Sequence, residues 1–369
     1  MGIGLSRWHE APHIRVATWV GVVISFAIIG WTPLDLGASA GGVPSDFNVG
    51  FQVLDLSHQK GRQGDTLTVA VWYPTEAKPK VHNYGGPTSG KVALNARPDS
   101  DRGPYPLLVF SHGYGGSGLS SVFFTEALAS RGWIVACPDH HDAHSAVRIR
   151  TGQRRDLDRA AFLREVMEIG ASAPADRGKY LYRLDEMQLV LGRMLASETF
   201  GPLIDKDRVA VGGHSFGGFT ALGLCGPIPE RHDPRVKAVL LFSTGAGSYL
   251  FTEEELAAVR IPSMLFMGEK EEMQLRGARS MLELETRIFR NVSPPKYFLV
   301  VKGGTHFSFN NRFSNSLWVR LMSGSESQFE VIRRYSIAFL ERHVLGGKDA
   351  ERLLQEKDPL LASYWREPR

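Results

Sequence analysis

A serine flanked by glycines follows a short apolar segment near the middle of the chain. The segment Val209-Ala210-Val211-Gly212 runs directly into Gly213-His214-Ser215-Phe216-Gly217, and a second apolar segment follows. This order predicts a strand, a sharp turn and a helix, with the hydroxyl of Ser215 presented at the turn. A side chain at Gly213 or Gly217 would collide with neighbouring backbone in so tight a turn, and glycine also tolerates its strained dihedral angles. The arrangement favours acyl transfer through a serine nucleophile.

Acyl transfer needs a base beside the serine, because a hydroxyl is a weak nucleophile at neutral pH. We predict that His306 is this base, since Gly303-Gly304-Thr305-His306-Phe307 comes just after an apolar run at residues 297–301. The base is expected after the serine in the chain, in a loop that follows a strand. Other histidines fall inside a predicted helix or precede the serine, namely His343, His140, His141 and His144.

The base in turn needs an acceptor that fixes its tautomer and stabilises its charged form. Glu271 is the predicted acceptor, because an apolar run at residues 263–267 ends at Gly268 and the next turn would present a carboxylate. Glu269 and Glu272 are neighbours that could take the same role. The chain order is then serine, acid, histidine, as expected for a strand-turn-helix nucleophile.

Two backbone N–H groups must also converge on the substrate oxygen that becomes negatively charged. The first predicted donor is the N–H of Phe216, directly after the serine. The second is the N–H of Tyr114, in the segment Ser111-His112-Gly113-Tyr114-Gly115-Gly116 that follows an apolar run at residues 107–110. The ring of Tyr114 would then line the acyl pocket.

The same glycine-rich segment also matches a different motif. Gly113, Gly115 and Gly118 follow a predicted strand, and Asp139 lies about twenty residues further on, as in a dinucleotide-binding fingerprint. The His-Gly pair at the start of the segment and the serine downstream fit acyl transfer better. We therefore expect no nucleotide and no other cofactor.

The segment Asp139-His140-His141-Asp142-Ala143-His144 contains residue types that bind metals. The spacing is compressed, and no second cluster supplies a remote ligand, so we expect no metal site. The segment follows a predicted strand at residues 133–137 and is expected at the rim of the active site. We predict that His140 or Asp142 contacts the substrate there.

Short apolar runs alternate with helical patterns along the chain, which predicts an α/β fold with a mostly parallel eight-stranded sheet flanked by helices. The first two strands are expected to form an antiparallel edge. The predicted strands are residues 49–56, 67–73, 107–111, 133–137, 208–212, 238–242, 263–267 and 297–301. The predicted helices are residues 119–131, 182–197, 216–224, 274–289 and 326–345.

Two segments interrupt this alternation. Residues 76–104 are rich in Pro, Gly and Asn and predict a long surface loop. Residues 146–179 carry several arginines around apolar side chains and fall where a cap over the active site would be inserted, so they are either a lid or a solvated basic helix. The tail at residues 346–369 is predicted as a short helix with a frayed end.

The N-terminal residues 1–40 predict an export signal. Arg7 and Arg15 precede an uncharged run at residues 16–31, and Ala38-Ser39-Ala40 matches a small-residue cleavage site. A cleaved signal is the first interpretation and an uncleaved membrane anchor the second. Either one places the catalytic domain, residues 41–345, outside the cytoplasm in a secreted or periplasmic protein.

Composition narrows the partners. The chain has 369 residues, 43% hydrophobic content and a formal net charge of +4 spread along its length, with no basic stripe of the kind that binds nucleic acid. The expected partner is a small-molecule or lipid ester, with membrane-surface contact through the N-terminal segment or the lid. Cys137 and Cys225 are predicted at opposite ends of the sheet, so two buried free thiols are expected rather than a disulfide.

Several motifs together resemble the platelet-activating-factor acetylhydrolase family of the α/β-hydrolase superfamily, and the related bacterial dienelactone-hydrolase-like and cutinase-like esterases. The resemblance covers about residues 49–345 and is carried by residues 106–115, 127–139, 213–218 and 303–309. It implies the α/β-hydrolase fold, with Ser215 as nucleophile, His306 as base, and Tyr114 and Phe216 as oxyanion donors.

The sequence departs from the acetylhydrolases at the acid. The family takes its acid just after the strand that matches residues 238–242, where this chain has Phe242-Ser243-Thr244-Gly245 without a carboxylate. The polyesterase-like branch takes it after the next strand, where Glu271 stands. The dienelactone hydrolases proper use cysteine at the nucleophile, so Ser215 argues against their chemistry.

The sequence therefore predicts a serine carboxylic ester hydrolase that forms an acyl-enzyme with short-chain acyl esters, including acetylated phospholipids. A cutinase-like polyesterase, or an acyltransferase with the same three residues, is the enzymatic alternative. The non-enzymatic alternative is a binding module with the hydrolase fold.

Overall fold

The computed structural model describes residues 47–57, 66–154, 156–272, 280–312 and 314–368. The predicted signal or anchor at residues 1–40 lies outside these ranges. No helix within them combines the length and the apolarity that a membrane span needs.

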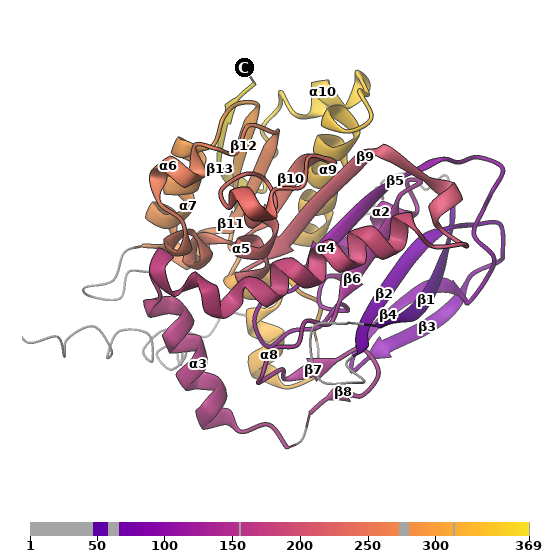
Figure 1. Ribbon diagram of the computed structural model, residues 1–369, viewed down its shortest axis with the longest axis horizontal. Helices are drawn as coiled ribbons and strands as arrows, with labels where there is room; N and C mark the ends of the chain where they lie inside the picture. The colour runs from indigo at the N-terminus through magenta and orange to yellow at the C-terminus, as the bar shows by residue number, and fades with distance from the viewer. Residues whose placement is uncertain (1–46, 58–65, 155, 273–279, 313, 369) are drawn as a thin grey trace, which may run out of the picture.

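One sheet of eleven strands runs through the described part of the chain, in the order β13-β12-β11-β10-β9-β5-β6-β2-β1-β4-β3. Its six central strands are mutually parallel and almost wholly buried, because helices cover both faces (Figure 1). They are β5 (Tyr105–Ser111), β6 (Ile134–Pro138), β9 (Ile204–His214), β10 (Val236–Phe242), β11 (Ser263–Gly268) and β12 (Lys296–Val301).

The remaining strands extend the sheet at both edges. β1 (Asn48–Ser57) and β2 (Thr66–Thr75) are antiparallel to each other, as predicted, and β2 joins β6. Beyond β1 lies a hairpin of β3 (Lys80–Gly85) and β4 (Thr88–Leu94), and at the other edge β13 (Leu361–Glu367) runs antiparallel to β12.

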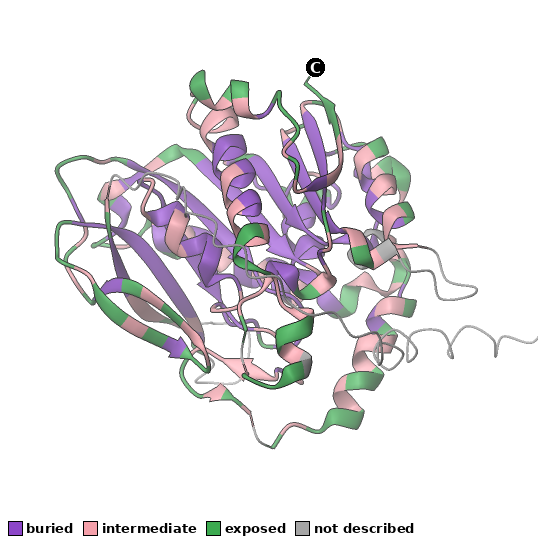
Figure 2. Ribbon diagram, turned by 180° about the vertical axis from the view of Figure 1, so that it is seen from behind, coloured by how far each residue is buried: buried purple, intermediate pink, exposed green. Residues whose placement is uncertain are grey.

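The sheet has three strands more than the eight predicted, namely β3, β4 and β13. The eight predicted runs are all strands, but β3, β4 and β13 are exposed along much of their length, as the alternating green and pink of the hairpin in Figure 2 shows. A strand that is exposed lacks the continuous apolar run that marks a buried one. For this reason the sequence predicted a long loop at residues 76–104, where the hairpin lies, and the frayed end of a short helix where β13 lies.

Successive residues of the central strands alternate between two cores, because side chains on a strand point to opposite faces. In β5, Leu107 and Val109 pack toward one face, and Leu108 and Phe110 toward the other. The first face is covered by α4 (Leu181–Leu195), α5 (Phe216–Gly223), α6 (Glu253–Leu256) and α7 (Met281–Asn291), and the second by α2 (Val122–Ala129) and α9 (Glu326–His343). The shorter helices are α3 (Arg159–Ala171), α8 (Leu317–Met322) and α10 (Asp349–Leu353).

The two cysteines are free and buried, as predicted. Cys137 lies in β6, and Cys225 lies just past α5. Burial raises the pKa of both thiols well above the ordinary value, so neither is a reactive thiolate at neutral pH.

The edge strand β13 contributes to the core through Leu361, which is only 2% exposed. We expect Leu361→Ala to lower the free energy of unfolding by about 2–5 kcal/mol, because it removes a buried side chain and leaves a cavity. Urea denaturation measures this. The control is Leu94→Ala at the opposite edge, where the side chain is exposed and the change should stay within about 0.5 kcal/mol. Equal stability of the two variants would contradict a folded C-terminal strand.

Candidate active site

Ser215 lies in the sharp turn between β9 and α5, with φ +54° and ψ −122°. Its N–H donates to the carbonyl of Phe242 on the neighbouring strand β10, at 2.8 Å. A Cβ atom added at Gly213 would lie 2.1 Å from the carbonyl oxygen of Gly217, and one added at Gly217 would lie 2.1 Å from that of Ser111. The turn therefore tolerates no side chain at either glycine, and it presents the serine hydroxyl in one fixed direction.

His306 and Glu271 reach Ser215 from the two strands beyond β10. His306 begins the short 3-10 helix after β12, and its Nε2 lies 2.9 Å from Oγ of Ser215. Glu271 lies in the turn after β11, and its Oε2 lies 3.1 Å from Nδ1 of His306. The carboxyl ends of parallel strands meet at one edge of the sheet, so three residues distant in sequence become neighbours.

Two of the other candidates for base and acid, Glu269 and His343, have different partners. Glu269 accepts a hydrogen bond from the N–H of Gly303 at 2.7 Å. The side chain of Glu272 lies outside the described part of the structure. His343 packs within α9 with its Nε2 3.1 Å from the hydroxyl of Tyr297, and burial lowers the pKa of His343 to about 4. Glu271 is the carboxylate that contacts His306.

The two predicted oxyanion donors belong to the turn of Ser215 and to the loop that packs against it. Phe216 is the first residue of α5, and the first N–H groups of a helix have no partner within it. A Cβ atom added at Gly113, the residue before Tyr114, would lie 3.1 Å from Cβ of Ser215, so the loop after β5 packs directly against the nucleophile turn. This arrangement can supply two N–H donors near the hydroxyl.

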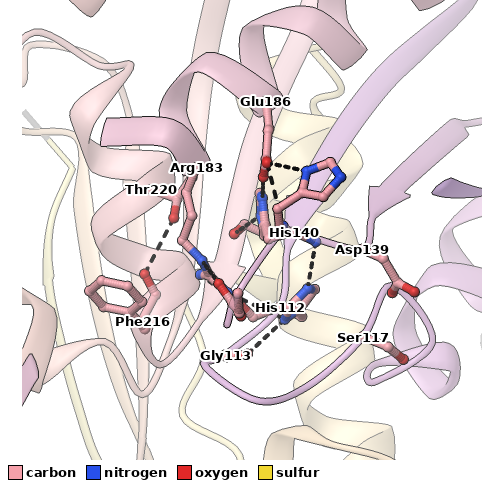
Figure 3. Close-up of polar contacts among 12 residues, drawn as sticks. His112, Gly113, Ser117, Asp139, His140, Arg183, Glu186, Phe216 and Thr220 are labelled. Carbon is pink, nitrogen blue, oxygen red and sulfur yellow. Dashed lines mark hydrogen bonds and ion pairs between the residues drawn. The ribbon is translucent and has the colours of Figure 1, made fainter. Parts of the chain in front are cut away.

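A buried ionic cluster lies directly behind this loop (Figure 3). Arg183 points from α4 and forms a two-pronged ion pair with Asp142, through contacts of 2.9 and 2.8 Å, and both side chains are fully buried. Arg183 also donates to the carbonyl of His112 at 3.0 Å. Burial alone would raise the pKa of Asp142, but the charge of Arg183 outweighs it and holds this pKa well below its usual range.

The hydrogen bonds of His112 fix its tautomer. Its Nε2 accepts from the N–H of His140 at 3.1 Å, so Nδ1 carries the proton and donates to the carbonyl of Gly113 at 2.7 Å. Burial and the charge of Arg183 lower the pKa of His112 well below 6.5, in agreement with a neutral ring. The carbonyl of Gly113 belongs to the peptide whose N–H is that of Tyr114. A hydrogen bond to the carbonyl polarises this N–H and holds the loop in place.

His140 and Asp142, predicted to contact substrate, lie inside this cluster. His140 is fully buried, with Nε2 2.8 Å from the hydroxyl of Ser111 and Nδ1 2.6 Å from Glu186. Asp142 is enclosed by Arg183 and by the hydroxyl of Tyr182. Neither side chain is accessible to a substrate, so the placement favours a supporting role instead of contact.

The sequence reasoning missed Arg183 and Glu186, because they lie in an ordinary amphipathic helix. They are three residues apart and therefore share one face of α4, as Figure 3 shows. Charged residues at core positions of an otherwise apolar helical face were the one available signal. His214 was missed too: its Nε2 lies 2.9 Å from the carbonyl of His306 and supports the loop that carries His306.

Asp139 of the dinucleotide-like pattern bonds to the protein's own backbone. Its two carboxylate oxygens accept from the N–H groups of Gly118, at 2.8 Å, and Ile149, at 2.6 Å. Burial raises the pKa of Asp139 to about 6 in spite of these bonds. The residue ties the glycine loop to the start of the 146–179 insertion.

The insertion covers this end of the sheet. It contains the hairpin of β7 (Val147–Arg148) and β8 (Gly152–Gln153), which lies with α3 at the lower edge of the molecule in Figure 1. The N–H of Ala146 donates to the carbonyl of Gly115 at 2.9 Å, and the ring of Phe162 on α3 stacks on that of Tyr114 with centroids 5.8 Å apart. The insertion thus contacts the proposed oxyanion loop directly.

Comparison with a solved structure decides the fold. The ferulic acid esterase from Streptomyces cinnamoneus superposes with a TM-score of 0.59 at 22% identity, over 86% of this chain and 94% of that one. The chain has the α/β-hydrolase fold. The predicted fold class and resemblance are confirmed, and the sheet is wider than predicted.

This α/β-hydrolase is also similar in sequence to esterases. Residues 81–162 match the family model described as "Platelet-activating factor acetylhydrolase, isoform II". Platelet-activating factor acetylhydrolase from Cavia porcellus is 24% identical over 65% of this chain and 58% of its own length, and that from Canis lupus familiaris is 24% identical over 70% and 62%. Esterase YjfP from Escherichia coli strain K12 is 34% identical over 40% of this chain and 48% of its own. The chain spans about three fifths of the length of these acetylhydrolases.

The buried pair gives a stability prediction. Arg183→Met should lower the free energy of unfolding by about 3–5 kcal/mol, because it leaves the charge of Asp142 buried without a partner. Urea denaturation measures the loss. The double variant Arg183→Met/Asp142→Leu should recover part of it, and Arg154→Met in an exposed pair should stay near wild type. A double variant no more stable than Arg183→Met would contradict this account.

The buried histidines give a pH prediction. The pKa values of His112 and His140 lie below 6.5 in the folded protein, chiefly because of burial, so the unfolded chain binds more protons below pH 6.5. The stabilisation should be fully present above about pH 7 and fall as pH drops from about 7 to about 5, by up to about 1.4 kcal/mol per pH unit for each histidine. Urea midpoints over this range test it. His140→Gln should make the dependence shallower, and an unchanged slope would contradict the assignment.

Proposed function

We propose that this protein is a serine carboxylic ester hydrolase. The proposal is carried by one observation, the unbroken series of contacts from Oγ of Ser215 through His306 to Glu271, at 2.9 and 3.1 Å. In the proposed reaction, Nε2 of His306 takes the proton of Ser215 while Oγ attacks the ester carbonyl. Glu271 accepts from Nδ1 of His306, which keeps the imidazole in the required tautomer and stabilises its charged form.

The remaining steps of acylation and the hydrolysis of the acyl-enzyme use the same groups. The N–H groups of Phe216 and Tyr114 stabilise the oxyanion, His306 returns the proton to the leaving alcohol, and an acyl-enzyme forms on Ser215. Water activated by His306 then releases the acid. The polarised peptide between Gly113 and Tyr114 supports this role, since its N–H is held in place from behind by His112.

The proposed substrates are short-chain acyl esters, with acetylated phospholipids as one class. The similarity to acetylhydrolases favours lipid esters. Exposed apolar side chains occur on α3, beside His306 and on α8, and they could contact a lipid surface; they are Leu163, Phe307, Leu317 and Leu321. Polyesters, and transfer of the acyl group to an alcohol, are alternatives on the same residues. We also propose that residues 146–179 act as a lid and that residues 1–40 direct export.

The central test is covalent labelling together with a panel of p-nitrophenyl esters and an acetyl-phospholipid. Ser215→Ala and His306→Ala should each lower kcat/KM by at least about a thousandfold, and Ser215→Ala should abolish labelling by a fluorophosphonate probe. Glu271→Ala should lose less, because it orients the base without reacting itself. Matched controls are the exposed Ser100→Ala and His232→Ala, which should behave as wild type.

A wild-type protein that resists the probe and all of these esters would contradict the proposal and favour a binding module. Product analysis with added alcohols separates hydrolysis from acyl transfer, since only a transferase forms the new ester in preference to the acid.

A further inference from the structure

A second hydroxyl lies inside the acid–base pair, and this inference rests on the proposed function. Ser243 follows the last residue of β10, at the position where the acetylhydrolase pattern has its acid. Its Oγ lies 2.7 Å from Nδ1 of His306 and also donates a short hydrogen bond to Oε2 of Glu271. The direct contact between Nδ1 and Oε2 is longer, at 3.1 Å. Each of the two hydrogen bonds made by Ser243 is therefore shorter than the direct contact between His306 and Glu271.

The protons in this group have one consistent arrangement. Nε2 of His306 faces the hydroxyl of Ser215 and must be free to accept its proton, so Nδ1 carries the ring hydrogen. Glu271 is an acceptor, and its other oxygen, Oε1, already accepts from the N–H of Gly268 at 2.7 Å. The Ser243 hydroxyl then donates to Oε2, and its lone pairs face the Nδ1 hydrogen. One hydroxyl thus satisfies both neighbours at once.

The backbone supports a specific use of this side chain. Ser243 has φ +48°, and among the described residues only two other non-glycine residues, Asn95 and Ser215, have positive φ. A non-glycine residue in this region is strained by about 1–3 kcal/mol, and glycine would avoid the strain. A serine here is therefore explained by its hydroxyl and not by its backbone. Ser243 is 1% exposed, and its N–H is held by the carbonyl of Phe266 at 2.7 Å.

A second carboxyl group lies near Glu271 but has a different partner. It belongs to Glu285, which is fully buried and accepts from the N–H of Gly245 at 2.7 Å. Burial and the charge of Glu271 raise the pKa of Glu285 well above its ordinary value. Glu271 is thus the carboxylate that faces His306 through the hydroxyl.

We propose that Ser243 is a positioning residue that relays the orienting hydrogen bond from His306 to Glu271. When His306 takes the proton of Ser215, the hydroxyl dipole and the carboxylate together stabilise the imidazolium. Ser243 keeps its own proton throughout, and no bond to it is made or broken. The hydroxyl and carboxylate from two adjacent strands together do the work that the acetylhydrolase pattern assigns to one residue.

The test compares Ser243→Ala with Ser243→Gly. Both remove the hydroxyl, but glycine also removes the backbone strain. Each should lower kcat by about tenfold to a hundredfold with KM unchanged, as expected for losing one hydrogen bond to a charged group, and the rate of fluorophosphonate labelling should fall in parallel. The thermal midpoint of Ser243→Gly should equal or exceed that of wild type.

A second test measures kcat of the double variant Ser243→Ala/Glu271→Ala. Because both residues act through one hydrogen-bonded path, its loss in kcat should be much smaller than the product of the two single losses. Losses that multiply would overturn the relay.

Other outcomes are equally decisive. A Ser243→Gly variant with wild-type kcat and labelling rate would overturn the inference while the proposed function stands. A wild-type protein that the probe does not label would instead overturn the proposed function itself.

Discussion

The close fit of the β9–α5 turn against the end of β5 is the constraint on which the site depends. Gly217 lies so near the carbonyl of Ser111 that any side chain would push the start of α5 away from the end of β5. This contact sets the distance between Ser215 in the turn and the loop that follows β5. Because main-chain atoms make the contact, it leaves little freedom for either loop to shift. The strained φ of Ser215 is maintained by the same packing.

Directly behind the loop that follows β5, the protein buries three charged side chains. Arg183, Asp142 and Glu186 are almost completely enclosed, and each makes several hydrogen bonds. Buried charges destabilise a fold unless they are paired, and replacing such a pair with apolar residues is often neutral. The cluster is therefore better explained by the positions it imposes on His112 and the Gly113 carbonyl than by its contribution to stability. It connects the first two turns of α4 to the peptide between Gly113 and Tyr114.

The acid side of the site is built from two neighbouring strands. The end of β10 supplies the hydroxyl of Ser243, and the turn after β11 supplies the carboxylate of Glu271, so both reach the same ring nitrogen of His306. This explains how the chain can depart from the acetylhydrolase pattern after β10 and still orient its histidine. Adjacent parallel strands end at the same edge of the sheet, and a charge can come from one while a hydrogen bond comes from the other.

The sequence by itself determined the central strands, the nucleophile turn and the order of Ser215, Glu271 and His306. Buried parallel strands are continuous apolar runs, and a turn without room for side chains requires glycine, so both can be recognised from adjacent residues in the sequence. Only the tertiary structure decided which of three neighbouring glutamates faces His306, that His140 and Asp142 are enclosed, and that β3, β4 and β13 widen the sheet. Edge strands carry no continuous apolar run, and the contacts of Arg183, Glu186 and Ser243 depend on which elements pack together, which no local spacing reveals.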